Sequence, residues 1–227
     1  MIAAAAQRAG LHLAGGDIVV ICQKAVSKAE GRIYDLKQVA PSELAQTIAA
    51  KWEKDARVVE LVLRQSNRIV RMDRGVIIVE TGPGWVCANA GLDESNSMAE
   101  ERAILLPVDP DASAARIRSE LRNLTGAEVA VLISDTFGRP WRDGLTEVCL
   151  GISGMDAMLD LRGTRDLGGR ELSHTVVAIA DELACAAGLL MEKASGIPAV
   201  LIRGYTYRPA PGTARILIRP AEADLFR

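Results

Sequence analysis

The stretch GGDIVVICQKAVSKAEG at residues 15–31 decides how the chain is expected to fold. Its Gly-Gly-Asp triplet ends a helical pattern that covers residues 2–13. The five apolar residues Ile18–Cys22 come next and are typical of a buried strand. The polar run Gln23–Gly31 then predicts a loop rich in lysine and serine directly after that strand.

Outward from this stretch, helical and strand patterns alternate. Pro41-Ser42-Glu43 opens a second helix that is expected to reach Trp52, and apolar residues continue the pattern over Ala56–Gln65. Short strands are expected around Ile69, over Val76–Glu80 and around residues 85–87, separated by glycines. This cluster predicts a mixed or antiparallel sheet.

The second half of the chain repeats this mixture. Helices are expected from Asp109 to about Leu124 and over Thr175–Lys193, the second being the longest and largely buried. The expected strands are Glu128–Ile133, Val148–Ile152, Ala199–Ile202 and Ile216–Ile218. Because no repeat, low-complexity tract or linker occurs, residues 1–227 are interpreted as a single α+β (mixed α/β) domain.

Composition excludes several classes of protein. A formal net charge of -2 gives no electrostatic reason to expect nucleic acid as a partner. Apolar runs fall short of the ~18 residues that a membrane span needs, and no signal peptide is indicated. The four cysteines form no CxxC pair, so their spacing indicates neither a zinc site nor a redox pair. Each lies in an apolar stretch, so reduced core thiols and a cytoplasmic location are expected. His12 and His174 are the two histidines, too few for a multi-histidine metal site.

Two polar segments could bind phosphate or metal. In Gln23–Gly31, lysines and a serine beside glycine suit phosphate, although the P-loop spacing is absent and solvated lysines are the alternative. In Asn89–Asn96, the side chains of Asp93, Glu94, Ser95 and Asn96 offer the hard oxygen ligands that magnesium or manganese prefers. The alternative for this second segment is a turn that caps the next element.

The most informative segment is ISDTFGRPWR at residues 133–142. A strand that ends in Ser-Asp-Thr would place the Asp135 carboxylate and the Thr136 hydroxyl at a sheet edge, where both could hold a divalent cation against phosphate. Arg139 and Arg142 could then grip phosphate or carboxylate groups. The alternative is that these arginines pair with nearby aspartates. The fourth segment, Met191–Pro198, is explained by helix termination, and its composition indicates no ligand role.

Six segments in this order and spacing resemble the coenzyme F420-0:gamma-glutamyl ligase family: QKAVSKAEGR, VCANAGLDESN, LPVDPDASA, ISDTFGRPWRDG, ADELACAAGLLMEKASGIP and the terminal DLFR. The resemblance runs from about Asp17 to Arg227, and SDTFGRPWR is its specific part. It implies a large mixed sheet flanked by helices in an intertwined homodimer, on a domain that is N-terminally short relative to the family. It also implies GTP as the energy source, Mn²⁺ or Mg²⁺, a stimulating K⁺ ion, and coenzyme F420-0 and L-glutamate as substrates.

The resemblance also implies roles for residues. Asp93 and Asp135 would bind one divalent cation, and Thr136 would help bind a second. GTP would contact Asn96, Gln23, Lys24, Lys28 and the turn that holds Met191, Glu192, Lys193, Ala194, Ser195 and Gly196. Our own hypothesis is that Lys28, Arg139 or Arg142 neutralises charge on the transferring phosphoryl group. The alternatives are a deazaflavin- or nucleotide-binding protein without turnover, and a related transferase with another carboxylate acceptor.

Overall fold

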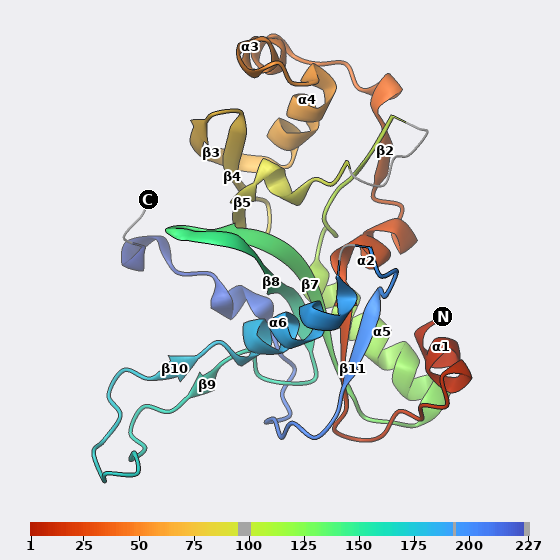
Figure 1. Cartoon of the computed structure of the whole chain (residues 1–227), viewed down its shortest axis with the longest axis vertical. Helices are drawn as coiled ribbons and strands as arrows, with labels where there is room; N and C mark the ends of the chain where they lie inside the picture. The colour runs from red at the N-terminus through yellow and green to blue at the C-terminus, as the bar shows by residue number, and fades with distance from the viewer. Residues whose placement is uncertain (95–100, 193, 225–227) are drawn as a thin grey trace. The chain divides into compact units, whose positions relative to one another are not determined.

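The computed structural model describes residues 1–94, 101–192 and 194–224, and its chain divides into two compact units (Figure 1). Unit 1 consists of Met1–Cys22, Asp109–Thr136 and Thr146–Arg219. Unit 2 consists of Gln23–Val108, Phe137–Leu145 and Pro220–Arg227. Helices and strands alternate in both, so the predicted α+β class is confirmed. The sequence shows no boundary because each unit is assembled from three separate stretches.

Unit 1 is built on a four-stranded mixed sheet in the order β11-β1-β7-β8. Strand β1 (Ile18–Cys22) pairs in parallel with β7 (Ala130–Arg139) and antiparallel with β11 (Ala199–Ile202). Strand β8 (Arg142–Ser153) follows β7 after a two-residue turn. The apolar runs that predicted β1 and β11 are buried or half-buried, and both predictions are confirmed.

Three helices belong to unit 1. Helix α6 (Ile179–Met191) packs on β1 and β11, and α1 (Ile2–Arg8) contacts α5 (Pro110–Thr125). The predicted start of α5 is confirmed, because the Asp109 side chain accepts the Ala112 N–H at 3.0 Å and proline follows it. Helix α1 ends well before residue 13 because Gly10 adopts a positive φ of 70°.

The predicted helix Thr175–Lys193 was too long at its start. Val176–Val177 form β10, which pairs with β9 (Leu159–Asp160) in an arm that projects from the rest of unit 1 (Figure 1). Helix α6 has 13 residues against 16 in α5, so it is not the longest. It buries one face only, since Leu189 and Leu190 are exposed.

Carboxylates join distant parts of unit 1. Asp111 of α5 accepts the backbone N–H groups of Ile152 at 2.9 Å and Ala214 at 3.0 Å, and the Thr213 hydroxyl. Asp181 of α6 accepts the N–H of Cys149 at 2.8 Å, and burial raises the pKa of its carboxyl.

Another such carboxylate is Asp17, which lies just before β1. It is 2% exposed and accepts two hydrogen bonds from Arg203 at 2.7 Å, which lower the pKa of its carboxyl. Arg203 follows β11 directly. Because Ile18 pairs with Ile202 in the antiparallel register, the Asp17–Arg203 contact joins the start of β1 to the end of β11 by side chains as well as by the backbone.

Unit 2 contains the elements from α2 to β6, listed in chain order: α2 (Gln23–Ala29), β2 (Ile33–Asp35), α3 (Glu43–Trp52), α4 (Ala56–Arg64), β3 (Ser66–Asp73), β4 (Val76–Thr81), β5 (Val86–Ala88) and β6 (Arg102–Ile104). Strands β3, β4 and β5 form an antiparallel sheet, as predicted. Residues of α3 and α4 share a buried apolar cluster with Ile77 and Val79 of β4. Strand β2 pairs separately with β6.

Capping residues set where helices α3 and α4 of unit 2 begin. Ser42 caps α3 by accepting the Ala45 N–H, which confirms the predicted helix to Trp52. Glu53 adopts the left-handed conformation at φ 53°, and Asp55 then starts α4 as a separate helix. The Glu60 carboxylate accepts both the N–H and the hydroxyl of Ser42, which joins the two helices.

Two further local predictions were wrong. The predicted loop over Gln23–Gly31 is helical up to Ala29, because Gln23, Val26 and Ser27 lie one turn apart and are buried. Where the strand Ile216–Ile218 was predicted, the chain instead forms a 3-10 helix over Ala214–Leu217. The Thr213 side chain caps this helix. Polar content concealed the first, and local capping overrode the β propensity of the second.

The cysteines and the helices agree with two expectations from composition. All four cysteines are free thiols; Cys87 and Cys149 are buried, while Cys22 and Cys185 are half-buried. Burial raises the pKa of the Cys149 thiol. Within residues 1–94, 101–192 and 194–224, no helix has the length and apolar character needed to cross a bilayer.

Candidate active site

Within unit 1, the carboxyl end of β1 brings two predicted segments together. Its last residue, Cys22, pairs with Ser134 of the parallel strand β7. The Cys22 N–H donates to the carbonyl oxygen of Pro198, the last residue of the Met191–Pro198 segment, at 2.9 Å. Gln23 and the rest of the first segment follow Cys22 along the chain. Ligands of α/β sheets commonly bind where parallel strands end, so this position suits a site.

Strand β7 continues past the predicted end at Ser-Asp-Thr as far as Arg139, because the hairpin partner β8 extends its pairing. The register with β1 stops at Ser134, so Asp135 is the first residue of β7 beyond it. Asp135 and Thr136 are half-buried. The Ser134 hydroxyl is fully buried and has no hydrogen-bond partner in the part of the chain that the structure describes. A buried hydroxyl of this kind has unused capacity for a ligand or water.

Helix α2 carries the side chains predicted to contact phosphate. Gln23 is 2% exposed, and its side-chain oxygen accepts the Ser27 hydroxyl at 2.9 Å. Lys24 is half-buried and Lys28 is exposed one turn later. The Lys24 and Lys28 side chains therefore project from neighbouring turns of one helix. A helix supports them more rigidly than the predicted loop would.

An ion pair joins the first and second segments within unit 2. The Lys24 ammonium pairs with Oδ2 of Asp93, and their side chains are 24% and 22% exposed. The backbone of Asp93 exchanges two hydrogen bonds of 3.0 Å with Ile104 of β6. Two residues that were predicted separately, one for nucleotide and one for metal, are thus direct partners.

The turn before Asp93 is left-handed. Asn89, Ala90 and Gly91 have φ values of 50°, 55° and 66° in succession. A Cβ atom on Gly91 would lie 2.7 Å from the Leu106 side chain, so a larger residue would have to displace that side chain as well as adopt a positive φ. Such backbone conformations persist only where the surrounding structure enforces them, and they are frequent at functional sites.

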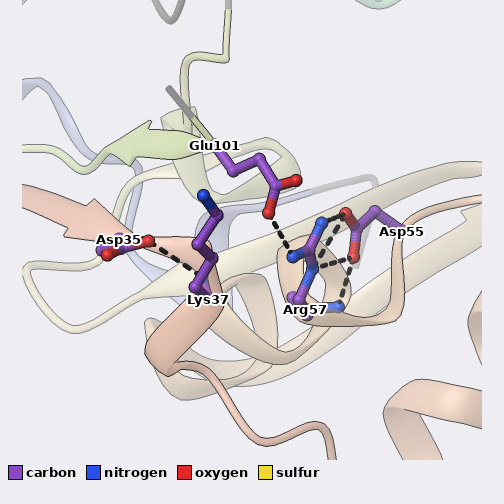
Figure 2. A network of polar contacts seen from close by, with 5 residues as sticks. All are labelled: Asp35, Lys37, Asp55, Arg57 and Glu101. Atoms are coloured by element: carbon purple, nitrogen blue, oxygen red, sulfur yellow. Dashed lines mark hydrogen bonds and ion pairs between the residues drawn. The ribbon is translucent and has the colours of Figure 1, made fainter. Parts of the chain in front are cut away.

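A polar network that the sequence did not predict supports the other end of β6. Figure 2 shows Arg57 of α4 between the carboxylates of Asp55 and Glu101. Its Nη1 donates to Glu101 at 2.6 Å, and its hydrogen bonds lower the pKa of the Asp55 carboxyl. The carbonyl of Glu101 also accepts the N–H of Leu36. Only the Asp-x-Arg pattern at the start of α4 could have indicated this contact, and it gives no sign of Glu101.

The two arginines of the third segment differ. Arg139 is half-buried, donates through Nη2 to the main-chain oxygen of Asp143 at 3.4 Å, and has a buried Nε without a partner among the described residues. Arg142 is exposed. This bond is not the alternative predicted above, an ion pair with an aspartate side chain, because its acceptor is the main-chain carbonyl of Asp143. Arg139 therefore has unused donor capacity of the kind that a phosphate or carboxylate would take.

The fourth segment forms a turn after α6. Met191 is buried, and its carbonyl accepts the Ser195 hydroxyl. Glu192 adopts a positive φ of 39°, and Ala194, Ser195 and Gly196 are exposed with it. Two of the predicted nucleotide contacts, Asn96 and Lys193, lie outside the described residues.

The metal ligands can be judged by their chemistry. Asp93 belongs to unit 2, whereas Asp135 and Thr136 belong to unit 1. Across the described ranges, no group of three or more histidine, cysteine, aspartate or glutamate side chains gathers around one point. Magnesium often takes only one or two carboxylates and completes its shell with water and substrate phosphate. Carboxylate and hydroxyl oxygens therefore fit a magnesium or manganese ion that arrives with a nucleotide.

Unit 1 also contains an open pocket of about 740 Å³ beside the start of α5. It is lined by Asp111, Ala112, Ala115, Arg118, Ile152–Gly154 and Pro209–Gly212. None of the residues predicted for the site lines it.

Comparison with known proteins identifies the family. The chain matches the family described as F420-0:Gamma-glutamyl ligase over residues 1–204. It is 47% identical over 230 residues to the coenzyme F420:L-glutamate ligase of Methanothermobacter thermautotrophicus, covering 100% of this chain and 91% of the relative. The chain belongs to the F420-0:gamma-glutamyl ligase family. The resemblance predicted from the sequence is confirmed.

Two other members of the F420-0:gamma-glutamyl ligase family are similarly close. The coenzyme F420:L-glutamate ligase of Methanocaldococcus jannaschii is 46% identical over 213 residues, which cover 93% of this chain and 85% of the relative. That of Methanopyrus kandleri is 47% identical over 221 residues, covering 95% and 87%. The protein is therefore an enzyme, a ligase that forms carbon–nitrogen bonds, as predicted.

Proposed function

We propose that this ligase adds L-glutamate to coenzyme F420-0, and extends the product by gamma-glutamyl linkage, at the expense of GTP. The names of its relatives support the substrates. Two contacts support the assignment of the site residues. Within unit 1, Cys22 at the end of β1 lies between Ser134 of the third segment and Pro198 of the fourth. Within unit 2, Lys24 of the first segment pairs with Asp93 of the second. We further propose a homodimer stimulated by K⁺. Four free thiols fit a cytoplasmic location.

The reaction must activate a carboxylate, because an amide does not form from a carboxylate and an amine in water. A carboxylate oxygen of coenzyme F420-0 attacks the gamma-phosphorus of GTP, the bond to the beta-phosphate oxygen breaks, and an acyl phosphate and GDP result. The amine of glutamate then attacks the acyl carbon and phosphate leaves. The amine loses a proton in this second step.

The protein's contribution is to bind and orient charged groups. Gln23, Lys24 and Lys28 would hold the nucleotide, and the exposed turn at Glu192 and Ala194–Gly196 would complete its pocket. Asp93 and Asp135 would hold one Mg²⁺ or Mn²⁺ ion and Thr136 a second; such ions neutralise charge on a transferring phosphoryl group.

Among the catalytic candidates we favour Arg139 over Arg142. The buried Nε of Arg139 has no partner among the described residues, whereas Arg142 is exposed. Arg139 would stabilise the charge that develops during phosphoryl transfer, together with Lys28.

The test is mass spectrometry of the deazaflavin after incubation of the protein with coenzyme F420-0, L-glutamate, GTP and Mn²⁺. We expect a mass gain of one or more glutamyl units, lost in Asp135→Asn. Asp143→Asn is the matched control, because Arg139 bonds to the main-chain oxygen of Asp143 and that bond does not need the carboxylate. Tight nucleotide binding without a mass gain would favour a binding protein, and a gain on another carboxylate would favour a transferase with a different acceptor.

A further inference from the structure

We propose that Lys24 competes with the divalent cation for Asp93, so that the cation binds tightly only when a nucleotide phosphate takes the lysine away. This inference rests on the proposed function, since it assumes that Asp93 is a metal ligand and that Lys24 contacts phosphate. It adds a coupling between the two ligands that neither assignment contains. The direct ion pair between Lys24 and Asp93 is the observation from which it starts.

The two partners differ in freedom. Asp93 is held by the paired hydrogen bonds to Ile104 and follows the left-handed turn that ends at Gly91. Its carboxylate is short and stays close to its backbone. Lys24 carries its ammonium on a four-carbon chain with several rotatable bonds. When the two groups separate, the lysine side chain is therefore the one that moves.

The ion pair between Lys24 and Asp93 affects the binding of the cation and of the nucleotide phosphate differently. A cation that reaches Oδ2 of Asp93 must displace the Lys24 ammonium, and it is repelled by that charge while the lysine remains nearby. A phosphate, in contrast, attracts the ammonium and draws it from Asp93. Because the coupling between two ligands is reciprocal, bound nucleotide raises the affinity for the cation and bound cation raises that for the nucleotide by the same factor.

Half-burial makes the effect measurable. With about a quarter of each side chain exposed, the pair is screened less than a fully exposed one, although water still weakens it. Removing the lysine charge should therefore tighten binding of the cation alone by roughly threefold to tenfold. It should also weaken nucleotide binding, since a phosphate contact is lost.

The experiment measures Mn²⁺ binding by electron paramagnetic resonance, first without nucleotide and then with the β,γ-imido analogue of GTP. Lys24→Gln should bind Mn²⁺ alone more tightly than the wild type, bind the analogue more weakly, and show a smaller gain in Mn²⁺ affinity when the analogue is present. Lys24→Arg, which keeps the charge, should resemble the wild type. Lys37→Gln controls for net charge and should change nothing, because Lys37 is an exposed lysine of the same unit whose backbone N–H, not its side chain, bonds to Asp35.

The outcomes separate this inference from the proposed function. Asp93→Asn should lose Mn²⁺ affinity; wild-type affinity in that variant would overturn the metal role of Asp93 and the inference with it. If Asp93→Asn loses affinity but Lys24→Gln gains none, the metal site stands and the competition is wrong. An equal gain in Lys37→Gln would also overturn the competition, because the effect would then be one of general charge.

Discussion

In unit 1 the carboxylates of Asp111 and Asp181 join residues that are far apart in the sequence, whereas in unit 2 the carboxylate of Glu60 bonds within its own helix and to the start of the preceding helix. Asp111 reaches Ile152 and Ala214, and Asp181 reaches Cys149. In unit 2, Glu60 of α4 accepts the hydroxyl of Ser42, which caps α3, and a hydrogen bond from Arg64 of its own helix. The difference follows from chain order: unit 1 takes elements from all three of its stretches and must fix them to one another, whereas most of unit 2 is the single stretch Gln23–Val108.

This comparison predicts that substitutions at the long-range contacts of unit 1 will be the more destabilising. Unit 2 is mostly one continuous stretch, so its elements are held together by short connections as well as by contacts. Removing a single polar contact there should have a limited effect.

The largest effect is expected at Gly151 of β8. A Cβ atom there would lie 2.3 Å from the carbonyl oxygen of Pro110, which is backbone and cannot turn aside. Gly151→Ala should lower the free energy of unfolding by about 3 kcal/mol or more. Gly138→Ala is the control from unit 2, since its nearest neighbour would be 3.9 Å away. Urea unfolding measures both, and equal stability of the two variants would contradict the clash.

Asp111→Ala should be the next most destabilising change. It leaves the buried or half-buried N–H groups of Ile152 and Ala214 without an acceptor, at a cost of about 2–4 kcal/mol in unfolding free energy. Asp111→Asn keeps an oxygen for both N–H groups and should lose less than half as much. Thermal unfolding of the two variants tests this. An alanine variant as stable as the asparagine variant would show that the hydrogen bonds to the Asp111 side chain do not stabilise the fold.

In unit 2, the hydrogen bonds from Ser42 and Arg64 lower the pKa of Glu60 from 4.5 to about 2. A lowered folded pKa means that the stabilisation is complete above the unfolded value of 4.5 and is lost as the pH falls toward 2. Glu60→Gln should cost about 1 kcal/mol at pH 7 and should flatten the loss of stability in that acid window. Glu120→Gln, at an exposed position of α5, should leave the window unchanged in unfolding measured from pH 7 to pH 2.

Asp181 should show the opposite sign and the smallest effect. Burial raises the pKa of its carboxyl above 3.8, so the folded state binds the proton more tightly and stability rises as the pH falls from the raised pKa toward 3.8. Asp181→Asn keeps an acceptor for Cys149 and removes the half-buried charge. It should therefore gain less than about 1 kcal/mol at pH 7. A loss of stability at pH 7, seen in the unfolding midpoint, would mean that the charge itself is stabilising.

The sequence predicted those elements whose signals are local. Helices α3 and α5 begin at Ser42 and Asp109 because capping is decided within a few residues. Strands β1 and β11 are buried apolar runs. In contrast, the second half of β7 is polar and is a strand only because β8 pairs with it, which no local pattern records. Helix α2 was missed because its lysines concealed the buried spacing of Gln23, Val26 and Ser27.

The candidate site was predicted as separate segments, without their arrangement. Polar residues after β1 and along β7 could be found from sequence, because they follow apolar runs. That Cys22 lies between Ser134 and Pro198 depends on the order of strands in the sheet. The pairing of Lys24 with Asp93 depends on how α2 lies against β6, and the role of Glu101 depends on Arg57.

The central position of β1 also has a consequence for protein synthesis. Both of its partners are translated much later, β7 from Ala130 and β11 from Ala199. At a synthesis rate of ~5–20 residues per second, the apolar strand Ile18–Cys22 waits on the order of ten seconds or longer for its second neighbour. The contiguous elements of unit 2 can fold in the meantime, while β1 still lacks its strand partners. Slow translation should therefore favour aggregation of this chain through its N-terminal strand rather than through unit 2.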